Sequence, residues 1–372
     1  MAKVDQVQVT SRQATGEVGM MKALVYRIAA DGATTHAWTD KPRPRIQDPG
    51  DAIVRMVTST ICGTDLHILK GDVPSVADGR ILGHEGVGVV EETGRGVTEF
   101  RPGDRVIISC ITSCSRCEFC KRGMLSHCTH GGWILGNLID GTQAEYVRIP
   151  YADGSLYHVP AGADEDALVM LSDTLPTAYE CGVLNGQIRP GDTVAIVGAG
   201  PIGIAGLLTA QLFSPSKIYV IDLDESRLAL AKQLGATDVV NSGKSDASAR
   251  VLALTEGRGV DVAMEAVGVP AAVELCQEIV GAGGRIANIG VHGKPVTLHL
   301  ERLWDRNITL TTRLVDTVTL PTLLDLVSSG KLRIDPLVTH HFDLHDIEKA
   351  YDTFQHAARE NALKIVLRSG KQ

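Results

Sequence analysis

Hydrophobic residues in the first 160 positions fall in short runs with turn residues between them. Gly, Pro and Asp separate these runs, and few stretches show the spacing of an amphipathic helix. The pattern therefore predicts an irregular, mostly β domain from Lys22 to about Val159. Its expected strands are 22–28, 51–57, 86–93, 105–109 and 144–149.

The pattern changes from about Asp164 onward, where helix-like segments begin to alternate with apolar strands. Such alternation predicts a parallel sheet covered by helices. The expected helices are 165–184, 203–213, 225–234 and 271–280. The expected strands are 193–198, 217–222, 260–268, 285–291 and 308–314.

The last part of the chain contains too little sheet to form a domain of its own. We expect its elements at 320–330, 337–343, 346–356 and 362–367 to return and complete the first domain. The expected α/β organisation is therefore one domain formed by 21–174 together with 316–372, and a second formed by 175–315. Residues 1–20 precede both as an extension without ordered structure.

Composition excludes several classes of partner. The formal net charge is −8 and no block of Lys or Arg stands out, so neither nucleic acid nor an anionic membrane is an expected partner. Residues 1–20 lack the apolar stretch of a secretory signal, and no apolar run is long enough to span a bilayer. We expect a cytoplasmic protein that binds small molecules.

A glycine-rich turn follows the apolar strand at 193–198 and opens the next helix. It reads Gly198-Ala199-Gly200-Pro201-Ile202-Gly203. In this pattern the first glycine permits a tight turn, the second lets a pyrophosphate approach, and the third lets the helix pack on the strand. The sequence therefore predicts a dinucleotide site.

An acidic residue ends the second strand of this unit. Asp222 lies about 20 residues beyond the glycines, where a carboxylate accepts hydrogen bonds from an adenine ribose and repels a 2′-phosphate. NAD is therefore expected rather than NADP, although Asp222 also fits a simple turn cap. Arg227 is placed either to contact the ribose or pyrophosphate or to serve as a solvated helix charge.

Four of the eight cysteines lie within fifteen residues. Cys114, Cys117, Cys120 and Cys128 form C-x2-C-x2-C-x7-C, a spacing that brings four thiolates to one structural zinc ion. An iron–sulfur cluster is the chemical alternative. The remaining residues Cys110, Cys181 and Cys276 are interpreted as core.

Two further motifs contain metal-binding residue types. They are Cys62-Gly63-Thr64-Asp65-Leu66-His67 and Gly83-His84-Glu85-Gly86-Val87-Gly88. With the cysteine lobe, LSDTLPTAYE, GAGPIG and HDIEKAYDTF, they make residues 22 to about 370 resemble the zinc-containing medium-chain alcohol dehydrogenases. The resemblance implies a GroES-like β domain with a catalytic zinc, a Rossmann domain, and an active site in the cleft between them.

The resemblance also assigns ligands to the catalytic zinc. Cys62 and His84 match two of them, and Asp173 falls where the third is expected. A carboxylate there departs from the Cys₂His set of alcohol dehydrogenase itself. Glu85 is the alternative third ligand, or a charge beside the metal. Counting the cysteine lobe, two zinc ions per subunit are expected.

The remaining roles also follow from the resemblance. Thr64 matches the hydroxyl that binds the alcohol oxygen, and His67 the end of a proton relay, a role that suits histidine as a residue type because its unperturbed pKa is near neutrality. Asp65 is expected to cap a helix or brace the site, and Trp133 either lines the substrate pocket or belongs to the core.

The expected reaction is oxidation of a small alcohol with hydride transfer to NAD. Polyol, threonine and formaldehyde dehydrogenases of the family are alternatives, as is a noncatalytic protein that binds zinc and dinucleotide. A homo-oligomer, with a tetramer favoured, is expected from the resemblance.

Overall fold

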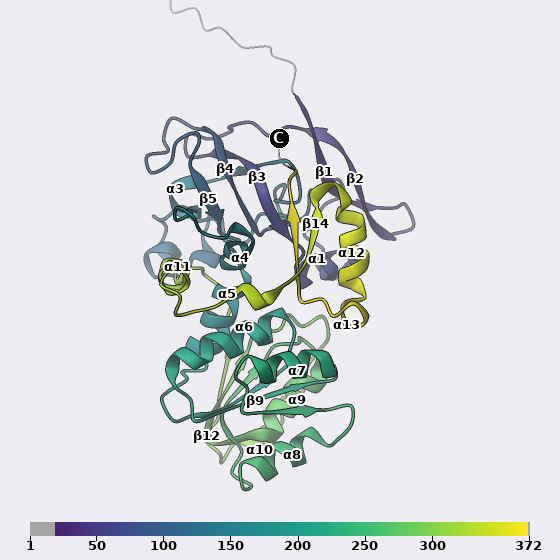
Figure 1. Cartoon of the computed structure of the whole chain (residues 1–372), viewed down its shortest axis with the longest axis vertical. Helices are drawn as coiled ribbons and strands as arrows, with labels where there is room; N and C mark the ends of the chain where they lie inside the picture. Colours follow the sequence, from purple (N-terminus) through teal and green to yellow (C-terminus); the bar gives the residue numbers. More distant parts are fainter. Residues whose placement is uncertain (1–18, 371–372) are drawn as a thin grey trace, which may run out of the picture.

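The computed structural model describes residues 19–370 and contains two bodies, which Figure 1 shows one above the other. The upper body contains the N-terminal strands and the C-terminal segment, and the lower body contains the middle of the chain. Residues 1–18 and 371–372 lie outside the described part, and most of the predicted N-terminal extension at 1–20 falls there.

The upper body is built on a seven-stranded sheet with the order β14-β15-β3-β4-β5-β7, in which β6 also pairs with β3. Its strands are β3 (Ala52–Thr60), β4 (Gly86–Thr93), β5 (Arg105–Ile108), β6 (Tyr146–Ile149), β7 (Leu156–His158), β14 (Val338–Asp343) and β15 (Lys364–Arg368). Because β15 runs antiparallel to β3, the end of the chain joins the first sheet. A separate hairpin is formed by β1 (Met20–Ile28) and β2 (Thr34–Pro42).

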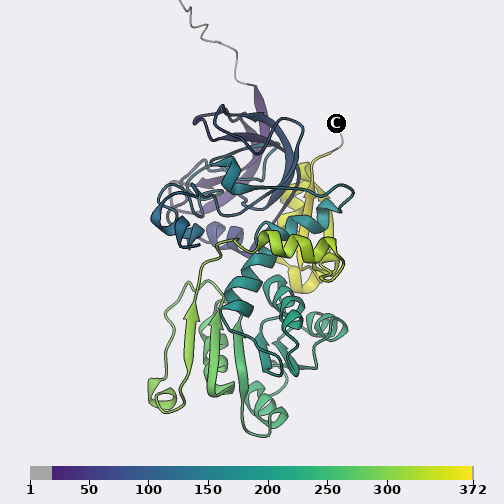
Figure 2. The same cartoon turned by 90° about the vertical axis from the view of Figure 1, so that its left-hand side faces the viewer.

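The lower body contains a six-stranded parallel sheet with the order β10-β9-β8-β11-β12-β13. Relative to the chain this is the order 3-2-1-4-5-6 of a dinucleotide-binding Rossmann sheet, and it confirms the predicted α/β class. Its strands are β8 (Thr193–Val197), β9 (Lys217–Asp222), β10 (Asp238–Asn241), β11 (Val260–Glu265), β12 (Val280–Asn288) and β13 (Thr309–Thr312). The turned view in Figure 2 shows helices on both sides of this sheet.

The helices cover the sheets and join the bodies. They are α1 (Gly63–Leu69), α2 (Glu118–Lys121), α3 (Ala152–Ser155), α4 (Glu165–Leu168), α5 (Thr174–Thr177), α6 (Pro201–Ala210), α7 (Glu225–Gln233), α8 (Ala247–Leu254), α9 (Pro270–Ile279), α10 (Leu300–Leu303), α11 (Leu320–Ser328), α12 (Ile347–Gln355) and α13 (Ala357–Glu360). Short 3₁₀ turns are η1 (Leu125–His127), η2 (Val169–Leu171), η4 (Gln211–Phe213), η5 (Asp335–Leu337) and η6 (Leu344–Asp346), and η3 (Ala178–Leu184) is a π-helix. Within residues 19–370, no helix is long and apolar enough to cross a membrane.

The long helix predicted at 165–184 is wrong in one respect that matters for the site. The segment is helical through α4 and η2, and then the backbone leaves the helical region at Asp173, with φ −150° and ψ −60°. Helical structure resumes at Thr174 and continues into η3. This interruption turns Asp173 toward the space between the two bodies.

Candidate active site and metal centres

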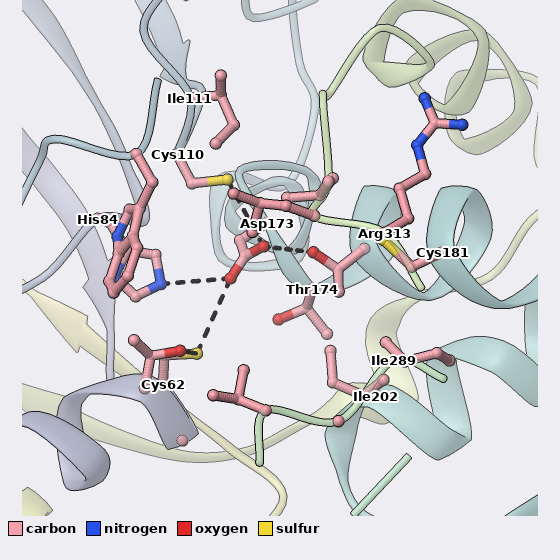
Figure 3. A pocket seen from close by; sticks show the side chains of 18 of the residues that line it. Cys62, His84, Cys110, Ile111, Asp173, Thr174, Cys181, Ile202, Ile289 and Arg313 are labelled. Carbon is pink, nitrogen blue, oxygen red and sulfur yellow. Dashed lines mark hydrogen bonds and ion pairs between the residues drawn. The ribbon is translucent and has the colours of Figure 1, made fainter. Parts of the chain in front are cut away.

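A cleft of about 990 Å³ lies between the two bodies. Cys62, His84 and Asp173 line it from the upper body, and Figure 3 shows Ile202 and Ile289 across the space from Cys62 and His84. The turns after β8 and β11, which are neighbouring strands in the sheet, also line it. The carboxyl ends of strands at such a switch in strand order are where parallel sheets bind ligands.

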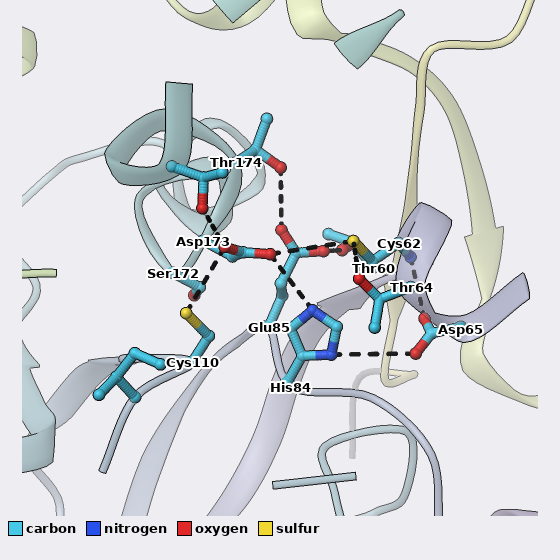
Figure 4. Close-up of polar contacts among 12 residues, drawn as sticks. Thr60, Cys62, Thr64, Asp65, His84, Glu85, Cys110, Ser172, Asp173 and Thr174 are labelled. Atoms are coloured by element: carbon cyan, nitrogen blue, oxygen red, sulfur yellow. Dashed lines mark hydrogen bonds and ion pairs between the residues drawn. The ribbon is translucent and has the colours of Figure 1, made fainter. Parts of the chain in front are cut away.

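Three predicted metal ligands converge in this cleft (Figure 4). Oδ2 of Asp173 lies 3.2 Å from Nε2 of His84 and 3.8 Å from Sγ of Cys62. His84 is buried, and Cys62 precedes the first turn of α1, where its backbone N–H is bonded to Asp65. Three separate segments therefore bring a sulfur, a nitrogen and an oxygen donor to one point.

The break in the helix is fixed by the loop that carries His84. The hydroxyl of Ser172 accepts a hydrogen bond from the backbone N–H of Gly86 at 3.1 Å and donates one to its carbonyl at 3.2 Å. On the other side, Oγ1 of Thr177 donates to Oδ1 of Asp173 at 2.5 Å. These hydrogen bonds hold the residue before Asp173 and the Oδ1 atom of Asp173 itself. Oδ2 is left to face Cys62 and His84.

The electrostatics of this site favour a positive charge beside Asp173. Burial alone raises the pKa of Asp173, but the hydrogen bond to His84 and the charge of its ring lower it to about 2. Burial likewise lowers the pKa of His84, and hydrogen bonds to Asp173 and Cys62 raise it well above its usual value. The donor set fits Zn²⁺, which binds sulfur, imidazole and carboxylate ligands.

Glu85 also lies close enough to be a metal ligand, since its carboxylate comes within 4.8 Å of the donor atoms of Cys62 and His84. Its oxygens are already engaged. Oε2 accepts from Thr60 and from the buried ammonium of Lys364, and Oε1 accepts from Thr174 at 3.0 Å. Asp173 is therefore better placed than Glu85 to be the third ligand, since the oxygens of Glu85 already have partners.

Lys364 is a site residue that sequence analysis missed. It lies in β15, its side chain is 2% exposed, and it donates to the carbonyl of Ile61 as well as to Glu85. Burial alone lowers the pKa of Lys364, but the charge of Glu85 raises it above its ordinary value. The available signal was a single lysine inside the apolar run Ala362–Leu367.

The two predicted relay residues lie on α1 and line the cleft. Oγ1 of Thr64 lies 3.7 Å from Sγ of Cys62, so the hydroxyl is beside the metal site. Nδ1 of His67 lies 2.8 Å from Oδ2 of Asp72, a partner that sequence analysis did not identify. An aspartate on Nδ1 leaves Nε2 of His67 for another partner.

Trp133 lines the same cleft. Its ring stands nearly perpendicular to that of His84, with 6.3 Å between centroids. It packs against a small buried cluster formed by Cys110, Ile111, Cys181 and Val315. Trp133 therefore borders the apolar core and also faces the cleft.

The cysteine lobe forms a second cluster of donors. The four sulfur atoms of Cys114, Cys117, Cys120 and Cys128 lie within 4.8 Å of one another, and all eight cysteines are free. The sulfurs of Cys114 and Cys120 are 4.0 Å apart, near the roughly 3.8 Å separation expected for thiolates tetrahedrally bound to zinc. Backbone hydrogen bonds from Cys120 and Thr129 lower the pKa of Cys117 to about 5, which favours the thiolate that a metal requires.

The glycine turn has the shape expected for a nucleotide site. Gly198 has φ +105°, and a Cβ on Gly203 would lie 1.8 Å from the carbonyl oxygen of Gly198. At Gly200, by contrast, the nearest atom to an added Cβ is Nη1 of Arg227 at 4.0 Å. The turn is closed by the outer glycines and open at the middle one, where Pro201 and Ile202 begin α6.

Asp222 is engaged with the backbone of this region. Its Oδ2 accepts from the N–H of Ala199 at 2.6 Å, and Oδ1 accepts from Leu223 and Asp224. The carboxylate therefore braces the glycine turn, and its remaining lone pairs are available to a ribose. Arg227 reaches the carbonyl of Ala362 at 3.5 Å, which links α7 to the C-terminal segment of the upper body.

Comparisons with known proteins agree with this geometry. Residues 48–161 match the alcohol dehydrogenase GroES-like domain, and residues 201–329 match the zinc-binding dehydrogenase family. An alcohol dehydrogenase of Cupriavidus necator is 38% identical over 369 residues, covering 94% of this chain and 99% of that protein.

Two solved structures extend the comparison. The apo form of zinc dependent alcohol dehydrogenase 2 from Streptococcus pneumonia is 51% identical, with a TM-score of 0.90 and coverage of 95% and 99% of the two chains. A protein of Sinorhizobium meliloti 1021 bound to NADP is 28% identical, with a TM-score of 0.82 and coverage of 94% and 99%. This chain therefore belongs to the zinc-containing medium-chain alcohol dehydrogenases. Within that family it is an oxidoreductase of the zinc-type alcohol dehydrogenase class.

The buried Lys364–Glu85 pair yields a test of how the site is held together. Lys364→Met leaves Glu85 as an uncompensated buried charge, so we expect the free energy of unfolding in urea to fall by about 3–5 kcal/mol. Lys364→Met/Glu85→Gln should recover much of that loss. Arg258→Met, which breaks an exposed pair with Glu256, should change stability by less than about 1 kcal/mol. A loss in Lys364→Met no larger than in this control would contradict the interpretation.

Proposed function

We propose that this protein reversibly oxidises a small primary or secondary alcohol to an aldehyde or ketone and passes the hydride to NAD. The observation that carries the proposal is the convergence of Cys62, His84 and Asp173 in a cleft lined by Gly200 of the glycine turn. The proposed cofactors are NAD and two zinc ions per subunit, one in this site and one in the cysteine lobe.

Each part of the site has a task in this reaction. Zinc bound by Cys62, His84 and Asp173 would act as a Lewis acid that makes the substrate hydroxyl more acidic. Thr64, beside Cys62, would accept a hydrogen bond from the substrate hydroxyl, and His67 would take up the released proton and pass it to solvent. Asp72 holds His67 in orientation through Nδ1.

The lining of the cleft supports a small, mostly apolar substrate. Ile111, Trp133, Ile289 and Val315 contribute apolar surface near the proposed metal, and Arg313 is paired with Asp316 at 2.7 Å. A panel of alcohols, polyols, threonine and hydroxymethyl thiols, assayed with NAD and NADP, separates the proposal from the related activities named above. Absence of turnover with every member would favour a noncatalytic role.

The proposed cofactor preference rests on the charge of Asp222. A carboxylate in contact with the glycine turn disfavours a further phosphate at the adjacent ribose. The proposed location is the cytoplasm, where free thiols and thiolate-bound zinc are stable.

We also propose a homo-oligomer in which second copies meet at the edge of the lower sheet. In the described chain β13 pairs on one side only, with β12, and its side chains are largely exposed. Apolar residues around it are exposed too, including Leu298, Leu300, Leu310 and Trp304, the last at 78%. An open edge flanked by exposed apolar residues is a surface on which a second copy can pair, and the favoured tetramer would add a second contact between such dimers.

Asp173→Ala tests the metal assignment through activity. Loss of one of three ligands should lower kcat/KM by at least about 100-fold, roughly 2.7 kcal/mol, while calorimetry still detects NAD binding. Asp325→Ala, an exposed aspartate on α11, should retain full activity. An active Asp173→Ala enzyme would refute the assignment.

Asp222→Asn tests the cofactor preference. The amide keeps an oxygen for the N–H of Ala199 but removes the charge that repels a 2′-phosphate. We expect the ratio of kcat/KM for NAD over NADP to fall by at least about tenfold, or roughly 1.4 kcal/mol. An unchanged ratio would show that another residue selects the cofactor.

Trp304→Glu tests the proposed subunit contact. A charge at this exposed residue should shift sedimentation velocity profiles toward smaller species if the residue is covered by a second copy, since a buried unpaired charge is costly. Leu138→Glu places the same charge at another exposed apolar residue and should leave the profile unchanged. Equal profiles for both variants would count against this surface.

A further inference from the structure

We propose that Tyr351, Gln143 and Asp65 form a buried hydrogen-bond chain that positions the metal ligand His84. Tyr351 then acts as a positioning residue from α12, the helix that carries the C-terminal motif HDIEKAYDTF. The inference rests on the proposed function, because it assumes that His84 holds the catalytic zinc.

The chain begins in the core of the upper body. Tyr351 is 1% exposed and packs in a cluster with Leu24, Ile61 and Ile68. Its hydroxyl donates to Oε1 of Gln143 at 2.9 Å. Burial raises the pKa of Tyr351 well above its usual value, so the hydroxyl keeps its proton and remains a donor.

The Gln143 amide is bonded at both ends. The amide has one acceptor end and one donor end, and Tyr351 occupies the acceptor end. The donor end, Nε2, bonds the carbonyl of Thr60 at 3.0 Å and Oδ2 of Asp65 at 3.0 Å. A flipped amide would set its oxygen against two acceptors, so the amide keeps Nε2 toward Asp65, and the hydroxyl of Tyr351 is the donor that satisfies the buried Oε1 in that orientation.

Gln143 is also tied through its backbone to the loop that carries His84. Its N–H donates to the carbonyl of Leu82 at 3.0 Å, two residues before the ligand. A Cβ on Gly83 would lie only 2.6 Å from Cγ of Gln143. Gln143 therefore contacts Asp65 through its side chain and the loop that carries His84 through its backbone.

Asp65 is the last member of the chain and faces His84. Its Oδ2 accepts from Gln143 and from the N–H of Cys62 at 2.9 Å, while Oδ1 lies 3.9 Å from Nδ1 of His84 (Figure 4). Among the described residues, both of these buried atoms lack a hydrogen-bond partner. Because Nε2 of His84 faces Asp173, Nδ1 is the atom through which a carboxylate can orient the ring for metal binding.

Tyr351→Phe removes one hydroxyl and keeps the ring. The matched control is Tyr219→Phe, which removes the hydroxyl of an equally buried tyrosine that bonds the carbonyl of Leu254 in the lower body. The readout is the rate at which zinc passes from the holoenzyme to a chromogenic chelator. Zinc in the cysteine lobe serves as an internal reference. Since direct partners of metal ligands change affinity about 10–100-fold, we expect Tyr351→Phe to release the catalytic zinc roughly 3- to 10-fold faster.

A double-mutant cycle tests whether the residues act as one chain. Gln143→Leu should release the catalytic zinc faster than Tyr351→Phe, and the double variant should be no faster than Gln143→Leu alone. Additive effects would overturn the proposal, as would release from Tyr351→Phe at the rate of the wild type or of Tyr219→Phe. If Gln143→Leu does not fold, Tyr351→Phe and its control decide the outcome.

Zinc content separates this inference from the proposed function. A wild-type protein that holds no zinc at Cys62 and His84 would contradict the proposed function and the inference together. Two ions in the wild type, with unchanged release from Tyr351→Phe, would contradict the inference alone.

Discussion

The structure depends on a group of charges held out of water where the two bodies meet. Asp173 and His84 face one another beside Cys62, and Glu85 and Lys364 form a fully buried pair directly behind them. Removing charges from water is expensive, so each must be compensated by its neighbours. Packing around the cleft brings these opposite charges into contact with one another.

Segments that are far apart in the sequence supply the charged residues of this group. The C-terminal strand supplies Lys364, the interrupted helix supplies Asp173, and the loop before β4 supplies His84 and Glu85. The return of the chain end to the first sheet is therefore part of the site as well as of the fold. The same segment carries α12, whose Tyr351 reaches toward the metal ligand through Gln143.

Most of the architecture could be predicted because periodic patterns determine it. The alternating strands and helices of the lower body and the glycine turn follow from local sequence, whereas β2, β10 and α8 were missed because their patterns are short or polar. Lys364, Asp72 and Gln143 could not be placed in the site, since their roles arise only from contacts across the fold. The break in the helix at Asp173 could likewise not be predicted from the sequence, because it depends on hydrogen bonds between Ser172 and Gly86.

The central claim is that Asp173, rather than Glu85, completes the metal site with Cys62 and His84. A crystal structure of the zinc-loaded protein with anomalous data at the zinc edge tests it most directly. We predict two peaks per chain, one in the cysteine lobe and one about 2.0–2.3 Å from donor atoms of Cys62, His84 and Asp173, with Glu85 still paired to Lys364. A peak bonded to Glu85 instead of Asp173, or no peak beside His84, would contradict the account.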